Sequence, residues 1–162
     1  MLTDIAEHAI RNFKLGDREL VVEFFENMGG ESRAFFNRGD GNKRGALEFF
    51  NRNGDEPGTI RFLSSVDCGG KEVMTGYVFA WDMGSKIPTL GIAVRDEYKG
   101  KGLGRRLMKH LIDYLEQNGY GGVMLTTAFA NIRGQGLYTR MGFEHIGTHA
   151  CGELLYLLKF KK

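Results

Sequence analysis

The chain has 162 residues, of which 24 are glycine and two are proline, and its net charge is +2 at neutral pH. The glycines follow no Gly-X-Y period, which excludes a collagen-like chain. The content of 26% charged and 42% hydrophobic residues is typical of a folded protein and excludes a disordered one. One domain is the default for a chain of this length, so we expect a single domain over residues 1–162.

Cysteine usage and hydropathy indicate the compartment. Cys68 and Cys151 lie far apart and form no Cys-x-x-Cys pair, so the sequence gives no reason to expect a zinc or dithiol site. Residues 1–7 lack the basic and apolar segments of a signal peptide, and no apolar run approaches the eighteen residues of a membrane span. We therefore expect a cytoplasmic protein with reduced cysteines and no membrane partner.

The N-terminal third is predicted to begin with a short strand at residues 10–15 and to continue as helices. Asp17 is a candidate N-cap for a helix that ends near Met28, before Gly29-Gly30. Hydrophobic spacing of three and four residues predicts further helical segments at residues 31–36 and 43–51. Three aromatic pairs are expected in the core and in the wall of a substrate slot: Phe24-Phe25, Phe35-Phe36 and Phe49-Phe50.

The remainder of the chain changes to strands that alternate with helices. Residues 59–66 and 72–81 are rich in β-branched and aromatic residues, and the turn between them predicts an antiparallel hairpin. The next elements are expected to be a strand at 89–94, a helix from a glycine loop to about Gln117, a strand at 123–128, a helix at 131–141 capped by Asn131, and strands at 143–148 and 153–160. This order predicts an α+β fold with a mixed, mostly antiparallel sheet flanked by helices.

The glycine loop at residues 99–104 carries the strongest functional signal. It joins a predicted strand to an amphipathic helix, and four cations surround it: Lys99, Lys101, Arg105 and Arg106. Alternating glycines let successive N–H groups point into one concavity, and a helix N-terminus favours phosphate. A tight turn beside a solvated basic face is the alternative, but three alternating glycines with four cations favour an anion site.

Two common phosphate-binding patterns do not fit this loop. The dinucleotide pattern requires a third glycine where Arg105 or Leu107 stands, and the P-loop requires Gly-Lys-Ser/Thr where the chain has Gly100-Lys101-Gly102. The loop is instead similar to the Gln/Arg-x-x-Gly-x-Gly/Ala motif of the GNAT family of N-acetyltransferases. Lys99 replaces the first residue of that motif, which keeps the positive charge but loses the bidentate geometry.

A second GNAT signature, Asn-x-x-Ala-x-x-Leu-Tyr followed by Gly-Phe, is matched by Asn131, Leu137-Tyr138 and Gly142-Phe143, with Gly134 in place of the alanine. The order and spacing of the two motifs make the resemblance specific, and it covers roughly residues 74–160. The resemblance implies the GNAT fold, transfer of an acetyl group from acetyl-CoA as cosubstrate to a primary amine of a small molecule or protein, and no metal.

The resemblance also implies roles for individual residues. Tyr138 matches the general acid that protonates the departing sulfur of CoA. The backbone of the fourth strand is expected to hold the pantetheine arm and the acetyl carbonyl, and a bulge at Gly91 could open a slot for them, although close packing would explain this glycine equally well. The residues expected to bind the cofactor are Ile92, Ala93, Val94, Lys99, Gly100, Lys101, Gly102, Leu103, Gly104, Arg105 and Asn131.

The general base is not assigned from the sequence. Many relatives place a glutamate on the fourth strand, but residues 89–94 contain no acidic residue. Asp82 is a substitute at the end of a predicted strand, and a turn role explains it equally well. His145 and His149 have a His-x3-His spacing, but we expect them to serve a strand and a turn and not to bind a metal.

Two other function classes stay open. The absence of an acid on the fourth strand would also suit a non-catalytic acyl-CoA-binding regulatory module. A nucleic-acid partner is not expected, because the net charge is only +2 and Tyr98 is the only aromatic residue among the clustered cations. GNAT proteins are often homodimers, which leaves a homodimer as an alternative to a monomer.

Overall fold

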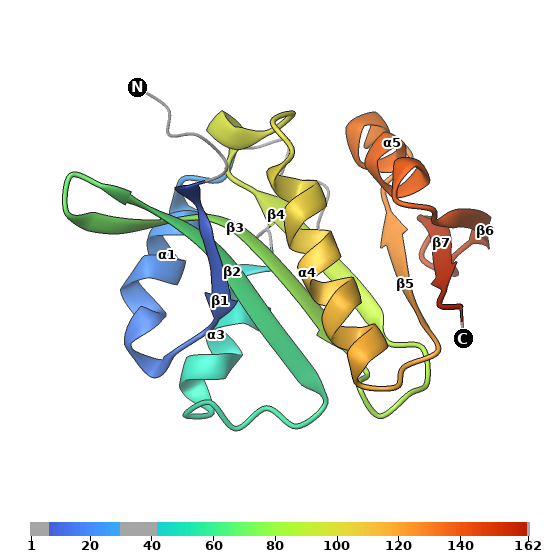
Figure 1. The fold of residues 1–162 in the computed structure, drawn as a ribbon, viewed down its shortest axis with the longest axis horizontal. Helices are drawn as coiled ribbons and strands as arrows, with labels where there is room; N and C mark the ends of the chain where they lie inside the picture. The colour runs from blue at the N-terminus through green and yellow to red at the C-terminus, as the bar shows by residue number, and fades with distance from the viewer. Residues whose placement is uncertain (1–6, 30–41, 162) are drawn as a thin grey trace.

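The protein is described by a computed structural model that covers residues 7–29 and 42–161. Its centre is a seven-stranded sheet with the order β1-β2-β3-β4-β5-β7-β6 (Figure 1). Every neighbouring pair is antiparallel except β4 and β5, which are parallel. The expected α+β fold with a mixed, mostly antiparallel sheet is therefore confirmed. The predicted helix at residues 31–36 and the pair Phe35-Phe36 lie outside the described residues.

The N-terminal half contributes the three antiparallel strands β1, β2 and β3 and the helices that cover one face of the sheet. Its elements are β1 (Ala9–Asn12), the short 3-10 helix η2 (Leu15–Asp17), α1 (Arg18–Glu26), α3 (Lys43–Asn51), β2 (Thr59–Cys68) and β3 (Lys71–Trp81). The predicted hairpin is confirmed, with Cys68 paired to Lys71 next to a turn at Gly69 and Gly70, both of which have positive φ.

The C-terminal half follows the predicted order closely. Its elements are β4 (Thr89–Val94), the 3-10 helix η4 (Asp96–Tyr98), α4 (Leu103–Gln117), β5 (Gly122–Thr127), α5 (Ile132–Arg140), β6 (Glu144–Thr148) and β7 (Leu154–Lys159). The chain runs from β5 through α5 to the edge strand β6 and returns with β7 between them. The return places the start of β7 beside the end of β5, where Thr127 pairs with Leu154.

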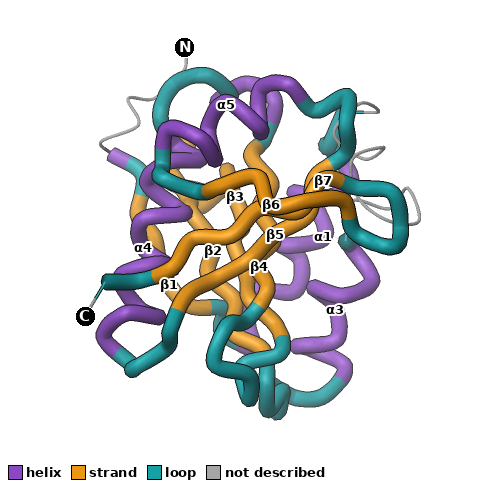
Figure 2. Tube along the Cα trace, turned by 90° about the vertical axis from the view of Figure 1, so that its right-hand side faces the viewer, coloured by secondary structure: helices purple, strands orange, loops and turns teal. Residues whose placement is uncertain are grey.

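Helices cover both faces of the sheet and divide its core into two layers. Figure 2 shows α4 on one side of the strands and α1 and α3 on the other. Residues of α4 and α5 pack with Val78, Leu90 and Leu125 in one cluster, and residues of α1 and α3 pack with Tyr77 and Ala93 in the other. Successive residues of a strand point to opposite faces, so these two clusters identify the face of every strand residue near the site.

Three details differ from the predictions or decide between alternatives. The first strand ends at Asn12 rather than near residue 15. Asp17 stands at the N-cap of α1, but its carboxylate does not cap that helix. It accepts a hydrogen bond of 2.7 Å from the backbone N–H of Lys14 and pairs with Arg11. The pairing of β3 with β4 is unbroken, so β4 has no bulge at Gly91, and this glycine serves close packing instead.

No helix in the described part of the chain is long and apolar enough to cross a membrane.

Candidate active site

The two parallel strands at the centre of the sheet separate and leave a slot. Only one residue pair, Thr89 with Met124, joins β4 to β5. In contrast, all six residues of β4 pair with residues of β3. A cavity of about 540 Å³ occupies the space between the separated strands and the ends of α4 and α5. Its lining includes five successive residues of β4, from Leu90 to Val94, and three of β5, from Leu125 to Thr127.

The slot leaves the edge of β4 without a partner strand. In an antiparallel pair the backbone groups alternate between the two sides of a strand, so half of the N–H and C=O groups of β4 point away from β3 and toward the slot. Among the described residues, no strand pairs with this side of β4 beyond Thr89. The residues that were expected to hold an extended ligand, Ile92, Ala93 and Val94, all line the cavity. Because the N–H of Arg95 donates a hydrogen bond to Thr75 of β3, the alternation directs the backbone groups of Ile92 and Val94 toward the slot and those of Ala93 toward β3.

The glycine loop closes one end of the cavity, and its three glycines have different roles. Gly100 and Gly102 have φ values of 73° and 93°, in the left-handed region that glycine adopts without strain. Gly102 is the N-cap of α4 and supplies no side-chain cap, so the N–H groups of the first helical turn remain directed at the cavity end. Gly104 permits close packing, because a Cβ there would lie 3.3 Å from Leu137 of α5.

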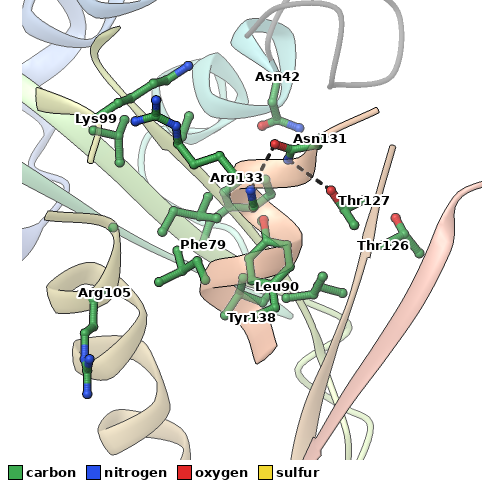
Figure 3. A pocket seen from close by; sticks show the side chains of 18 of the residues that line it. Asn42, Phe79, Leu90, Lys99, Arg105, Thr126, Thr127, Asn131, Arg133 and Tyr138 are labelled. Carbon is green, nitrogen blue, oxygen red and sulfur yellow. Dashed lines mark hydrogen bonds between the residues drawn. The ribbon is translucent and has the colours of Figure 1, made fainter. Parts of the chain in front are cut away.

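Cations gather at this end of the cavity. Lys99 lines it and pairs with Asp96 at 3.1 Å. Arg133 of α5 was not predicted from the sequence. Its Nη1 lies 2.8 Å from the position that a Cβ on Gly100 would occupy, so its guanidinium group is next to the loop. Figure 3 shows Arg133 and Lys99 at the same end of the cavity, while Arg105 extends along α4 away from them. One cation, Lys99, thus comes from the loop itself, and the other, Arg133, comes from α5.

Two predicted loop residues do not line the cavity. The side chain of Lys101 is exposed, and Leu103 is completely buried in the core under α4. Their backbone still belongs to the loop and to the first turn of α4. Since the side chain of Leu103 is apolar and buried, this residue can contact an anion only through its N–H group.

Asn131 fixes the start of α5. Its Oδ1 accepts a hydrogen bond of 3.1 Å from the N–H of Gly134, and its Nδ2 donates to Thr127 Oγ1 at 3.0 Å (Figure 3). The predicted cap is therefore confirmed. A Cβ on Gly134 would lie 2.9 Å from Asn131 Cγ, so an alanine at this position would require the Asn131 side chain to shift. By linking the end of β5 to α5, Asn131 fixes the direction of the helix that carries Tyr138.

Tyr138 lies in the middle of the cavity lining (Figure 3). Its side chain is 6% exposed and packs against Tyr156 and Phe143, with ring centroids 5.8 and 6.1 Å away. Burial raises the pKa of Tyr138 to about 12, and a hydrogen bond with Thr127 offsets only part of this effect. Tyr138 therefore keeps its proton throughout the physiological pH range, as a proton donor must.

The acidic residue of the cavity is not one that the sequence singled out. Asp82 follows β3 with a φ of 62°, is exposed and does not line the cavity. Glu153, in the turn before β7, does line it and accepts a hydrogen bond of 2.8 Å from Thr126 Oγ1. No local motif marks Glu153. Its position depends on the return of β7 to the side of β5, which sequence periodicity does not reveal.

The two paired histidines take no part in the cavity. His145 contacts the carbonyl of Gly147, and the ring of His149 lies 3.1 Å from the sulfur of Cys151 in the turn between β6 and β7. Among the residues that the structure describes, no group of three or more histidine, cysteine or acidic side chains is arranged to hold a metal ion.

Comparison with known families gives one match that covers most of the chain. The model of the acetyltransferase (GNAT) family matches residues 30–143. Among curated proteins, the [ribosomal protein bS18]-alanine N-acetyltransferase of Escherichia coli K12 is 42% identical over 53 residues, which are 33% of this chain and 36% of that protein. The match to this relative therefore spans about a third of its length.

Solved structures share the fold along nearly the whole chain. The PaiA N-acetyltransferase of Thermoplasma acidophilum, solved in complex with coenzyme A, aligns with a TM-score of 0.76 and 16% identity over 94% of this chain and 99% of that one. The E. coli ribosomal-protein-S18-alanine N-acetyltransferase aligns with a TM-score of 0.68 and 22% identity over 96% and 95% of the two chains. At these identities the likeness concerns the fold.

Proposed function

The chain belongs to the acetyltransferase (GNAT) family, and we propose that it transfers an acetyl group from acetyl-CoA to a primary amine of a small molecule or protein. One observation carries this proposal. A slot with unpaired β4 backbone leads from a glycine-lined helix N-terminus to a buried, protonated tyrosine. A long ligand with an anionic end and an extended arm fits this arrangement, and acetyl-CoA has both.

The pyrophosphate is assigned to the glycine loop. Its N–H groups and the first turn of α4 favour an anion, and the cations of Lys99 and Arg133 lie at the same place. The extended pantetheine arm is assigned to the free edge of β4, where peptide-like groups can replace a missing strand. The residues of this cofactor site are Ile92, Ala93, Val94, Lys99, Gly100, Lys101, Gly102, Leu103, Gly104, Arg105, Asn131 and, from the structure, Arg133.

The chemical step requires a polarised thioester, a neutral amine and a proton for the leaving thiolate. We assign the first to N–H groups of β4, which would stabilise negative charge on the carbonyl oxygen as the amine attacks. We assign the third to the hydroxyl of Tyr138, which is protonated at neutral pH and lies in the cavity lining. The nitrogen–carbon bond forms, the carbon–sulfur bond breaks, and the sulfur leaves as the thiol.

The organisation of the protein is part of the same proposal. We place residues 1–162 in a single N-acetyltransferase domain, since both core layers share one sheet. We also propose a cytoplasmic location, which suits the two free and exposed cysteines, Cys68 and Cys151. Acetyl-CoA and an amine are the proposed partners. Nucleic acid and membrane are not among them, and a homodimer remains an alternative to the monomer.

The test combines binding with turnover. Calorimetry with acetyl-CoA should give a 1:1 complex, and a panel of amines should release CoA thiol. Gly102→Val should abolish binding, because a β-branched residue is strained at a φ of 93° and crowds the anion site. Gly58→Val is the matched control, since Gly58 has a φ of 90°, equally open surroundings and no place in the cavity.

Two results would contradict the proposal. Unchanged acetyl-CoA affinity in a folded Gly102→Val protein would remove the loop assignment. Binding of acetyl-CoA without thiol release for any amine would favour the non-catalytic acyl-CoA-binding module instead.

A further inference from the structure

We propose that Glu153 binds and deprotonates the acceptor amine, and that this acceptor carries one positive charge next to an apolar or aromatic group. The inference rests on the proposed acetyl transfer and identifies the side of the slot from which the amine enters.

Tyr138 and Glu153 approach the slot from opposite faces of the sheet. Leu125 belongs to the core layer under α4 and α5, which also contains Tyr138. Its neighbour Thr126 must therefore point to the opposite face, the one that α1 and α3 cover. Since Thr126 Oγ1 donates a hydrogen bond to Glu153, the carboxylate lies on that face as well. The proton donor and the carboxylate are thus separated by the slot itself.

An aromatic wall lies at the same level on the same face. The pair Thr89–Met124 sets the parallel register, so Gly91 of β4 stands level with Thr126 of β5. Phe79 pairs with Gly91 from β3 and belongs to the core layer of α1 and α3. The tip of its ring rests over Gly91, where a Cβ would lie 2.6 Å from Phe79 Cε1. A molecule in the slot would therefore have Phe79 on one side and Glu153 on the other.

The aromatic wall continues outward to solvent. Trp81 stacks on Phe79 with a centroid distance of 5.5 Å and is 42% exposed. Both residues line the cavity. An apolar or aromatic group attached close to the amine can therefore cover the wall while the nitrogen reaches Glu153.

The charges of the lining limit the acceptor to one positive charge. Among the described lining residues, Glu153 is the single acidic side chain, whereas four are cationic: Lys99, Arg105, Arg133 and Arg140. One carboxylate matches one ammonium group. A polyamine would bring further positive charges into a cavity without acidic partners for them, at a cost in desolvation and repulsion.

The carboxylate also supplies the missing proton acceptor. A primary amine is mainly ammonium at neutral pH and cannot attack until it loses a proton. Glu153 takes that proton and passes it to water. The free amine then attacks the thioester carbon, the sulfur leaves with the proton of Tyr138, and the second proton lost by the nitrogen restores the tyrosine. In total, one ammonium and one thioester give one amide, one thiol and one proton.

The experiment compares Glu153→Gln with wild type on four acceptors: 2-phenylethylamine, tryptamine, an alanyl dipeptide amide and spermidine. We expect the three monocationic amines to be turned over at least about tenfold better than spermidine by wild type. For Glu153→Gln at pH 7 we expect a loss of about 100-fold or more in kcat/KM, as for a general base. This loss should shrink between pH 7 and 9, because free amine becomes more abundant in solution.

Controls separate this assignment from folding and from the proposed function. Glu153→Gln should bind acetyl-CoA like wild type, Glu153→Asp should recover part of the activity, and Glu144→Gln, which changes an exposed glutamate of β6, should have no effect. If wild type turns over the amines and Glu153→Gln does so with the same kcat, KM and pH profile, the role of Glu153 is overturned. Preference for spermidine would overturn the acceptor class. Absence of acetyl-CoA binding by wild type would overturn the proposed function itself.

Discussion

Replacing Gly91 by alanine should damage the acceptor side of the slot while leaving the cosubstrate side intact. The added Cβ would lie 2.6 Å from Phe79 Cε1, whereas carbon atoms pack at about 3.5–4.0 Å. The ring tip must therefore move by about 1 Å. Tyr77 stacks against the same ring at a centroid distance of 4.6 Å, and Trp81 stacks on it too. The ring therefore has little free space in which to move.

The size of the effect follows from overpacking. Added methyl groups in a well-packed site typically cost about 1–3 kcal/mol, and each kcal/mol lowers the melting temperature of a chain of this size by about 2–4 °C. We expect Gly91→Ala to melt several degrees lower, to show a raised KM for the amine, and to bind acetyl-CoA with little change. Thermal unfolding and initial rates measure these quantities.

A double-mutant cycle tests whether the collision with Phe79 is the cause. Phe79→Leu shortens the side chain, so Gly91→Ala should cost less stability in that background than in wild type. Gly16→Ala is the control, because a Cβ at Gly16 would meet nothing within 4 Å. Equal costs of Gly91→Ala in both backgrounds would refute the reasoning, as would a Gly91→Ala protein with wild-type stability.

Three further predictions concern the cosubstrate side. Tyr138→Phe should lower kcat by about 100-fold or more and leave the Kd for acetyl-CoA nearly unchanged, and an unchanged rate would remove Tyr138 from the mechanism. Burial raises the pKa of Tyr138 to about 12, and the protonated form is the donor, so loss of activity from its ionisation should begin only above about pH 11. A fall in activity that is centred near pH 10 and disappears in Tyr138→Phe would contradict this prediction. Arg133→Gln should raise the Kd for acetyl-CoA roughly tenfold or more, which is the loss expected for a hydrogen bond to a charged group, and added salt should reduce the difference in Kd from wild type. Equal calorimetric affinities of the two proteins would exclude a contact between Arg133 and the pyrophosphate.

Local sequence patterns predicted the elements that carry the glycine loop very well. β4 and α4 were expected at residues 89–94 and up to Gln117, and the structure has them there. The amphipathic spacing of α4 and its flanking glycines are signals within one element, which a single sequence displays. The cap at Asn131 was predicted on the same basis, since an N-cap acts within one turn of its helix.

Residues placed by contacts between distant elements were harder to predict. Glu153 reaches the cavity only because β7 returns beside β5, and its partner Thr126 lies 27 positions earlier. Arg133 meets the glycine loop across the gap between α5 and Gly100. Gly91 was interpretable in two ways until the Phe79 ring above it was known. In each case the deciding contact is long-range, and neither propensity nor periodicity reports it.

The separation of β4 from β5 places two strand edges inside the molecule. An exposed outer edge invites pairing with another chain, and proteins protect such edges to avoid aggregation. Here the two edges face each other across a narrow space, joined at Thr89–Met124 and flanked by helices. A second polypeptide strand has no access from the side, whereas a thin extended arm can enter along the strand direction. Exchange of the β4 amides that face the gap, those of Ile92 and Val94, should therefore be fast in the free protein and slow once that arm occupies the gap.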